Sequence, residues 1–294
     1  MNKMLRKISL LFLSLGSLYP AADAQITGGQ NVFSFLNLPQ SARLTALGGM
    51  QIAAKDDDVA FAAANPAVLN PSMDGRITLQ HNFFLSDIQH GYVAYANHLP
   101  AIGFTVQGGL QYVGYGDIPQ TDEYGNKMGS VKASETAFTL GGARLLTDRV
   151  SLGLNLRFGF STLAEYKSTA LAADAGLMYA DTARRFVATL VLRNAGAQLS
   201  TYAGKREYLP FDLQVGFSKR LRYLPFRLSV IAHHLHQWEI RYDDPNAEDD
   251  DVLVFGEEGD NNNNDKNSGV DNFFRHLVFN GEFLLGRNEA FQLR

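Results

Sequence analysis

The segment between residues 149 and 163 constrains the fold more than any other part of the sequence. Apolar and polar side chains alternate strictly along it, with Leu152, Leu154, Leu156, Phe158 and Phe160 on one face and Ser151, Gly153, Asn155, Arg157 and Gly159 on the other. A period of two residues is typical of a β-strand. Strands of soluble sandwiches usually have about five or six residues, whereas a strand that crosses a bilayer at barrel tilt needs roughly nine to eleven. The length of this alternation favours a membrane-spanning strand.

The same alternation recurs at 102–110, 186–192, 211–217 and 277–285. The second face of these segments carries small or polar residues, and with neighbouring strands it includes the charged residues Arg157, Asp174, Asp212 and Glu282. Such a face suits a lumen filled with water or with a plug better than the dry core of a β-sandwich. The sequence therefore predicts an all-β fold, a transmembrane antiparallel β-barrel.

The connections between the expected strands alternate in length. We expect strands at about 76–85, 88–98, 101–116, 131–146, 149–163, 168–180, 184–198, 207–219, 224–238, 272–286 and from 290 onward. The short links alternate with longer ones, apart from the short link at 86–87, as periplasmic turns alternate with extracellular loops. The strand from Leu224 then runs outward and brings Trp238 to an aromatic girdle at the membrane interface.

The number of expected strands is odd. About eleven strands are visible between residues 76 and 294, while a closed bacterial barrel has an even number. The sequence thus predicts that the barrel domain, residues 76–294, is incomplete at its C-terminal end, unless one strand is miscounted.

The N-terminus has the pattern of an export signal. Lys3, Arg6 and Lys7 precede the apolar stretch 8–18, and Ala22-Asp23-Ala24 offers a cleavage site. We expect residues 1–24 to be a signal peptide and Gln25 to begin the mature chain. With no Cys in the sequence, neither a lipoprotein anchor nor a disulfide framework is expected. A mean hydropathy of −0.13 argues against a helical membrane protein, and a net charge of −4 argues against nucleic acid as a partner.

Residues 25–75 do not have the pattern of spanning strands. They contain Arg43, the run Asp56–Asp58 and the pair Asn65-Pro66, and a short helix is expected from about Val59 to Ala64 because Pro66 stops it. Polar groups at this density are costly in lipid but fit the interior of a barrel. We expect residues 25–75 to be an N-terminal plug segment.

Part of this segment resembles a known family. The stretch SARLTALGGMQIAAKDDDVAFAAANPAVLN is similar to the N-terminal hallmark of FadL-like outer-membrane barrels, especially the PorV/PorQ group of the type IX secretion system. The preceding FSFLNLPQ and the triple Asp most resemble PorQ-like members. The resemblance implies a barrel of about fourteen strands, with a plug that here contains Arg43, Asp56, Asp57, Asp58, Asn65 and Pro66.

The resemblance also implies a function. It suggests a non-enzymatic scaffold in the bacterial outer membrane that belongs to the attachment complex of the type IX secretion system. Such a scaffold anchors a PorZ-like surface partner and works beside PorU-like and PorV-like components, in contact with outer-membrane lipid and with the lipopolysaccharide to which cargo is attached. The alternative is a FadL-like channel for uptake of hydrophobic small molecules, with the plug as its gate.

Several acidic groups are candidate sites. The run Asp56–Asp58 suits capping of the expected helix or pairing with Arg43 better than it suits a metal, since it lacks the alternating acidic residues and Gly of a calcium loop. The acidic stretch 243–271 is expected to be a solvated extracellular loop. Within it Val252, Leu253, Val254 and Phe255 form an apolar island that is a possible partner contact.

The remaining candidates point away from enzymatic chemistry. A period of two across 233–238 predicts that His234 and His236 face outward beside Trp238 while His233 faces the lumen, so no shared metal site is expected. Nucleophile elbows, His-Glu-x-x-His, phosphate loops and paired Cys are absent from the sequence. We expect no catalytic residue, no metal and no cofactor.

Overall fold

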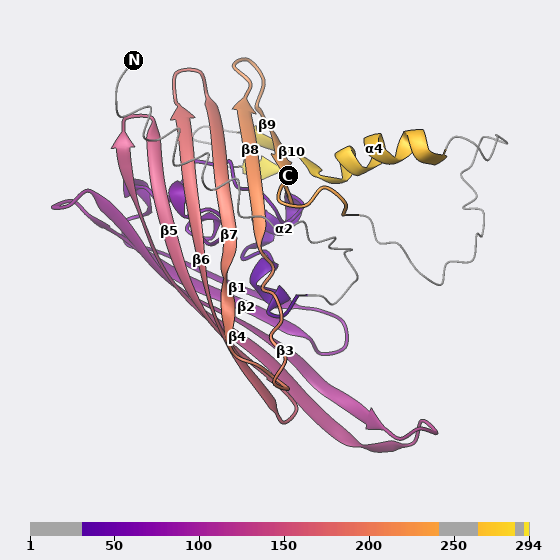
Figure 1. Cartoon of the computed structure of the whole chain (residues 1–294). Coiled ribbons are helices and arrows are strands. Elements are labelled where there is room, and N and C mark those ends of the chain that lie inside the picture. The colour runs from indigo at the N-terminus through magenta and orange to yellow at the C-terminus, as the bar shows by residue number, and fades with distance from the viewer. Residues whose placement is uncertain (1–30, 241–263, 286–290, 294) are drawn as a thin grey trace, which may run out of the picture.

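The computed structural model describes residues 31–240, 264–285 and 291–293, and these form one antiparallel β-sheet with a few short helices. Its strands follow one another across the sheet in chain order, so that each is hydrogen-bonded to its neighbours in the sequence (Figure 1). The strands are β1 (Arg76–Phe83), β2 (Gln89–Leu99), β3 (Phe104–Thr121), β4 (Lys127–Thr147), β5 (Val150–Leu163), β6 (Tyr166–Asp181), β7 (Phe186–Ser200), β8 (Asp212–Arg220), β9 (Phe226–Ala232), β10 (Leu277–Leu285) and β11 (Phe291–Leu293). The all-β, antiparallel prediction is confirmed.

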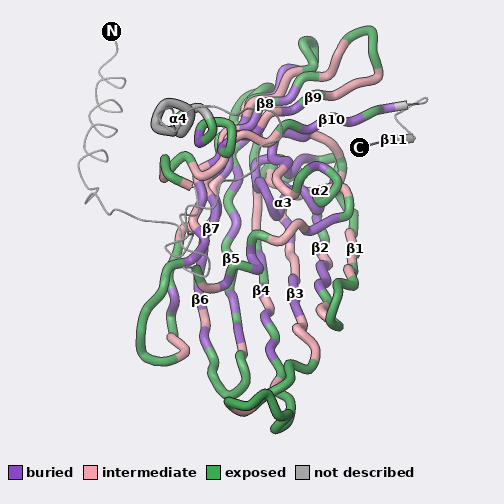
Figure 2. The backbone as a smooth tube through the Cα atoms, turned by 90° about the vertical axis from the view of Figure 1, so that its right-hand side faces the viewer, coloured by how far each residue is buried: buried purple, intermediate pink, exposed green. Residues whose placement is uncertain are grey.

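The two faces of the sheet differ as the alternation predicts. Along β5 the apolar row from Leu152 to Phe160 is exposed, whereas Ser151, Asn155 and Arg157 are buried. Figure 2 shows the same alternation of buried and exposed residues along β3 to β6. Asp174, Asp212 and Glu282 are buried as well, so the four predicted inward charges all face the inner side.

The prediction of a loop at 117–130 is wrong. β3 continues to Thr121 and β4 begins at Lys127, with Asp117 opposite Lys132 and Pro119 opposite Ser130. These residues are largely exposed on both faces, so neither an inner nor an outer apolar row marks them as strands in the sequence.

The expected strand at 224–238 is too long. β9 ends at Ala232, and His234 takes a positive φ of 53°, which breaks the extended conformation. The expected strand from 272 begins later, because residues 272–275 belong to helix α4 (Asn264–Arg275) and β10 starts at Leu277. A polar sequence with three His and no regular apolar period gives little warning of either change.

The sheet has edges within the described residues, where β1 pairs with β2 alone and β11 pairs with β10. Among the described helices none has the length and apolarity needed to cross a membrane.

Residues 31–75, called the inner segment below, lie against the buried face of the sheet (Figures 1 and 2). The segment contains η1 (Ser34–Asn37), α2 (Ala42–Ala46), α3 (Phe61–Ala64), η2 (Pro66–Val68) and η3 (Pro71–Met73). Side-chain caps start three of these short turns: Ser41, Asn65 and Asn70 accept hydrogen bonds from the backbone N–H groups of Leu44, Ala67 and Ser72. The helix expected near 59–64 is confirmed as α3.

Candidate functional site: the contact between inner segment and sheet

The inward side chains of β5 hold the backbone of the inner segment. Ser151 Oγ donates to the carbonyl of Ala67 at 2.7 Å, and Asn155 Nδ2 donates to the carbonyl of Ala62 at 2.9 Å. Arg157 donates through Nη2 to the carbonyl of Ala63. Ala62 and Ala63 belong to the single turn of α3, so two carbonyls that a short helix leaves without internal partners are satisfied by the sheet.

Arg157 is a buried cation of this contact. Its Nε donates to Asp174 Oδ2 at 2.7 Å, with 2% and 0% of the two side chains exposed, and its Nη1 donates to the carbonyl of Leu36 at 3.1 Å. The other carboxylate oxygen of Asp174 accepts the backbone N–H of Asn194 at 2.8 Å. A buried ion pair is tolerated when further hydrogen bonds satisfy both ions, and here they do.

The Asn-Pro-Ala element docks where the sheet has no side chains. Gly153 and Gly176 lie opposite each other in β5 and β6. A Cβ atom on Gly153 would lie 2.3 Å from the carbonyl carbon of Pro66, and one on Gly176 would lie 2.2 Å from Asn65 Oδ1. Asn65 itself is fully buried and donates to the carbonyl of Ile52 at 2.8 Å. The motif thus needs a pair of glycines to approach the sheet backbone.

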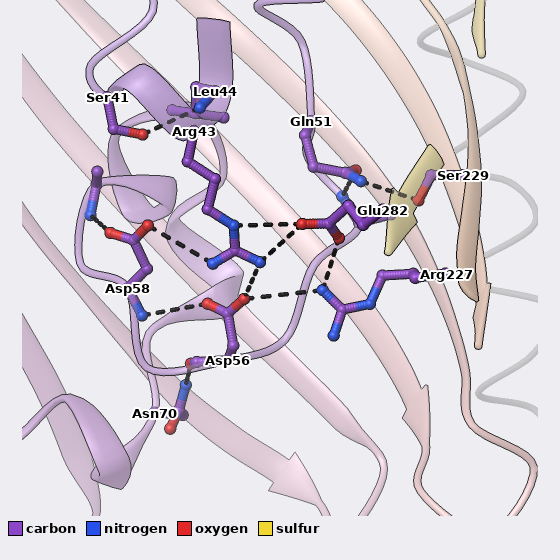
Figure 3. A network of polar contacts seen from close by, with 12 residues as sticks. Ser41, Arg43, Leu44, Gln51, Asp56, Asp58, Asn70, Arg227, Ser229 and Glu282 are labelled. Atoms are coloured by element: carbon purple, nitrogen blue, oxygen red, sulfur yellow. Dashed lines mark hydrogen bonds and ion pairs between the residues drawn. The ribbon is translucent and has the colours of Figure 1, made fainter. Parts of the chain in front are cut away.

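A second ionic cluster joins the inner segment to the last strands (Figure 3). Arg43 Nη2 lies 2.5 Å from Asp56 Oδ2 and 3.1 Å from Glu282 Oε1, and its Nη1 lies 3.6 Å from Asp58 Oδ2. Arg227 of β9 reaches Glu282 Oε2 at 2.8 Å and Asp56 Oδ2 at 3.9 Å. Two guanidinium groups therefore alternate with three carboxylates across the contact. Burial lowers the pKa of Arg43, but the facing carboxylates outweigh it and raise that pKa, so the group stays charged.

The triple Asp is divided among three roles. Asp56 and Asp58 face Arg43, and Asp58 Oδ1 also accepts the backbone N–H of Ala60 just before α3. Asp57 turns away and pairs with Arg76 at 2.7 Å, where both side chains are about half exposed. Sequence reasoning named Arg43 with the Asp run, but it did not identify Glu282 and Arg227 as partners. Their only signal was a charge at an inward strand position.

The histidines after β9 lie elsewhere than the periodicity predicts. His234 Nδ1 and His236 Nδ1 both lie 4.0 Å from the carboxylate of Asp212, a buried inward residue. The outward placement of His234 and His236 is therefore wrong, because the strand ends before them. Burial lowers the pKa of His233 and of His236. Trp238 is exposed and stacks on His276.

A cavity of about 270 Å³ opens between the inner segment and the turn ends of β6 to β9. Its charged lining consists of Lys55, Arg185, Arg220, Arg227 and Asp181. The predicted apolar island Val252, Leu253, Val254 and Phe255 lies outside the described residues.

Comparison with known proteins adds one match. A protein-family model described as "Uncharacterised protein family (UPF0164)" matches residues 17–199. That range includes the inner segment, β1 to β6 and nearly all of β7. No curated protein matches the chain.

The glycine pair predicts a steric test. Gly153→Ala places a methyl group in the backbone of Pro66 and should lower the free energy of unfolding by about 1–3 kcal/mol. Gly108→Ala is the matched control, because a Cβ there meets only Leu140 Cδ2 at 3.9 Å. Denaturant unfolding in detergent measures both, and equal stabilities of the two variants would contradict the docking.

The ionic cluster predicts an asymmetry between two arginines of the same region. Arg43→Gln removes one of the two cations that Asp56 and Glu282 share, and it should lower the free energy of unfolding by about 3–5 kcal/mol. Arg76→Gln removes an exposed pair and should cost at most about 1 kcal/mol. Thermal unfolding compares them, and limited proteolysis of the inner segment should accelerate only in the Arg43 variant.

The coupling energy between Arg43 and Glu282 distinguishes loss of their ionic contact from a general loss of packing. In a double-mutant cycle with Glu282→Gln, the costs of the two substitutions should fall short of additivity, since each breaks the same contact. Additive costs would show that Arg43 and Glu282 act independently.

Proposed function

The chain belongs to the UPF0164 family, and we propose that it is a plugged outer-membrane β-barrel that serves as a non-enzymatic scaffold. In this proposal the inner segment is the plug, and the barrel belongs to the attachment complex of a type IX secretion system. The observation that carries the proposal is the pairing of an exposed apolar outer face with an inner face filled by residues 31–75.

The outer face supports a membrane environment. Leu140 of β4 and Leu154 and Leu156 of β5 lie on neighbouring strands and are each more than half exposed, as is Phe279 of β10. Soluble monomers rarely expose apolar patches of this extent. Lipid-facing apolar residues that alternate with polar inward ones are the pattern of outer-membrane barrels.

A barrel further requires that β1 and β11 be joined, directly or through additional strands. An unpaired strand edge in hydrocarbon costs several kcal/mol for each unsatisfied backbone group. The proposal therefore includes closure of the sheet in the membrane, which agrees with the strand number that the family resemblance implies.

The filled interior favours a scaffold over a channel. Arg157, Asn155 and Ser151 donate to plug carbonyls, and the Arg43 cluster ties the plug to β9 and β10. A FadL-like channel needs an apolar path for its substrate, whereas the lining of the cavity beside Lys55 includes four cationic side chains and Asp181. A sealed barrel is suited to holding a partner at the surface.

The choice of partner rests on the resemblance of residues 33–70 to PorQ-like members of the PorV/PorQ group. It makes a PorZ-like surface protein the anchored partner, with PorU-like and PorV-like components and lipopolysaccharide nearby. The loops after β3, β5, β7 and β9 share one end of the sheet, and in this proposal that end faces outward.

The membrane part of the proposal predicts a depth-dependent effect. Leu154→Arg puts a charge at mid-strand on the outer face. It should make the free energy of folding into lipid vesicles less favourable by roughly 2–4 kcal/mol. Leu85→Arg, in the turn after β1 where the side chain is 90% exposed, should have little effect. Equal tolerance of both substitutions would argue for a water-exposed sheet.

The scaffold part predicts what deletion does. Loss of the protein should release the surface partner into the medium while the outer membrane stays impermeable. Affinity purification of the tagged barrel from detergent-solubilised membranes should retain a surface or secretion component. A deletion strain that keeps its surface partner but no longer takes up an apolar substrate would support the channel instead.

A further inference from the structure

Three metal-binding side chains converge where β8 begins and β9 ends. One ligand atom from each of Asp212, His233 and His234 lies within 4.8 Å of the other two. Asp212 is buried and the two His side chains are partly buried. Asp212 is the first residue of β8, whereas His233 and His234 directly follow β9, so the pairing of β8 with β9 brings the carboxylate to the two rings.

The backbone turn at His234 produces the convergence. In an extended strand, adjacent side chains point to opposite faces. The positive φ of His234 ends that alternation, and the rings of His233 and His234 lie edge to face with centroids 4.8 Å apart. His234 is held there by its own N–H, which donates to Asp212 Oδ1 at 2.6 Å.

The ring nitrogens face each other closely. His233 Nδ1 and His234 Nδ1 are 2.5 Å apart. Two lone pairs at this distance repel each other unless a proton or a metal ion lies between or beside them. Two nitrogens of a tetrahedral zinc site are about 3.3 Å apart, given Zn–N bonds of about 2.0–2.1 Å.

The neighbouring groups fit a supporting role. Gln214 Nε2 donates to Asp212 Oδ2 at 2.6 Å, as the outer hydrogen bonds of metal ligands commonly do. His236 Nδ1 lies 4.0 Å from Asp212 Oδ1, outside the group of three. His276 is not a ligand candidate, because its Nδ1 and Nε2 contact the carbonyls of His233 and Trp238.

We propose that Asp212, His233 and His234 bind a divalent transition-metal ion of the Zn²⁺ class. Imidazole nitrogen with one carboxylate selects zinc and its first-row neighbours over Mg²⁺ and Ca²⁺, which prefer oxygen. The ion links the start of β8 to the chain that leaves β9. The site therefore stabilises the loop end of the sheet, and it does so independently of the scaffold function.

The first test is a titration of the full chain. The protein is purified in detergent through a tag without histidine, stripped with chelator and titrated with Zn²⁺ by calorimetry. We expect one ion per chain, with no displacement by excess Ca²⁺. Asp212→Asn and His234→Gln should each weaken zinc binding by at least about tenfold. His98→Gln is the control, since His98 lies in β2 and contacts Thr105 Oγ1.

The second test needs no variant and so does not depend on how well a variant folds. Cu²⁺ bound to the wild-type chain should give a paramagnetic resonance spectrum with hyperfine splitting from at least two imidazole nitrogens. A spectrum of oxygen ligands alone would place the ion at acidic groups and overturn the proposal. Absence of zinc binding at micromolar concentration, or equal affinity in the Asp212 and His98 variants, would overturn it as well.

Discussion

The buried ion pair between Arg157 and Asp174 is the interaction on which the rest of the structure depends. A guanidinium group inside a protein is tolerated only if its donors are satisfied. All three guanidinium nitrogens of Arg157 donate hydrogen bonds: Nε to Asp174, Nη1 to the carbonyl of Leu36 and Nη2 to the carbonyl of Ala63. Removal of the inner segment would leave Nη1 and Nη2 without these acceptors. The charge in the sheet therefore requires the segment, and the segment requires the charge.

The same logic explains why the inner face is polar and small rather than apolar. Glycines at 153 and 176 let the chain at Asn65 and Pro66 reach the sheet backbone. Around them, Ser151 and Asn155 supply donors for carbonyls that the short helices leave open. An apolar row at these positions would bury the carbonyls without partners, at a cost of about 1–3 kcal/mol each.

Much of the sheet could be predicted from the sequence, because a period of two is a local signal. The row from Leu152 to Phe160 and the inward position of Arg157 follow directly from it. Pairing of Arg43 with the Asp run could be predicted from the sequence, but its contact with Glu282 could not, because Glu282 is far away in the sequence and only the strand register brings it near. The predicted placement of His234 and His236 was wrong for another reason. The backbone at His234 leaves the extended region, and periodicity carries no information about where a strand stops.

Strand β5 recognises the inner segment through main-chain carbonyls, those of Leu36, Ala62, Ala63 and Ala67. Carbonyl groups are common to all residue types. Many side chains of the segment could therefore be exchanged without loss of these contacts, provided that the path of its backbone is preserved. The donors on β5 have no such freedom, since each depends on the reach of one particular side chain. The inner segment therefore tolerates more substitutions at this contact than β5 does. An inner segment from a distant relative could still form these hydrogen bonds with β5.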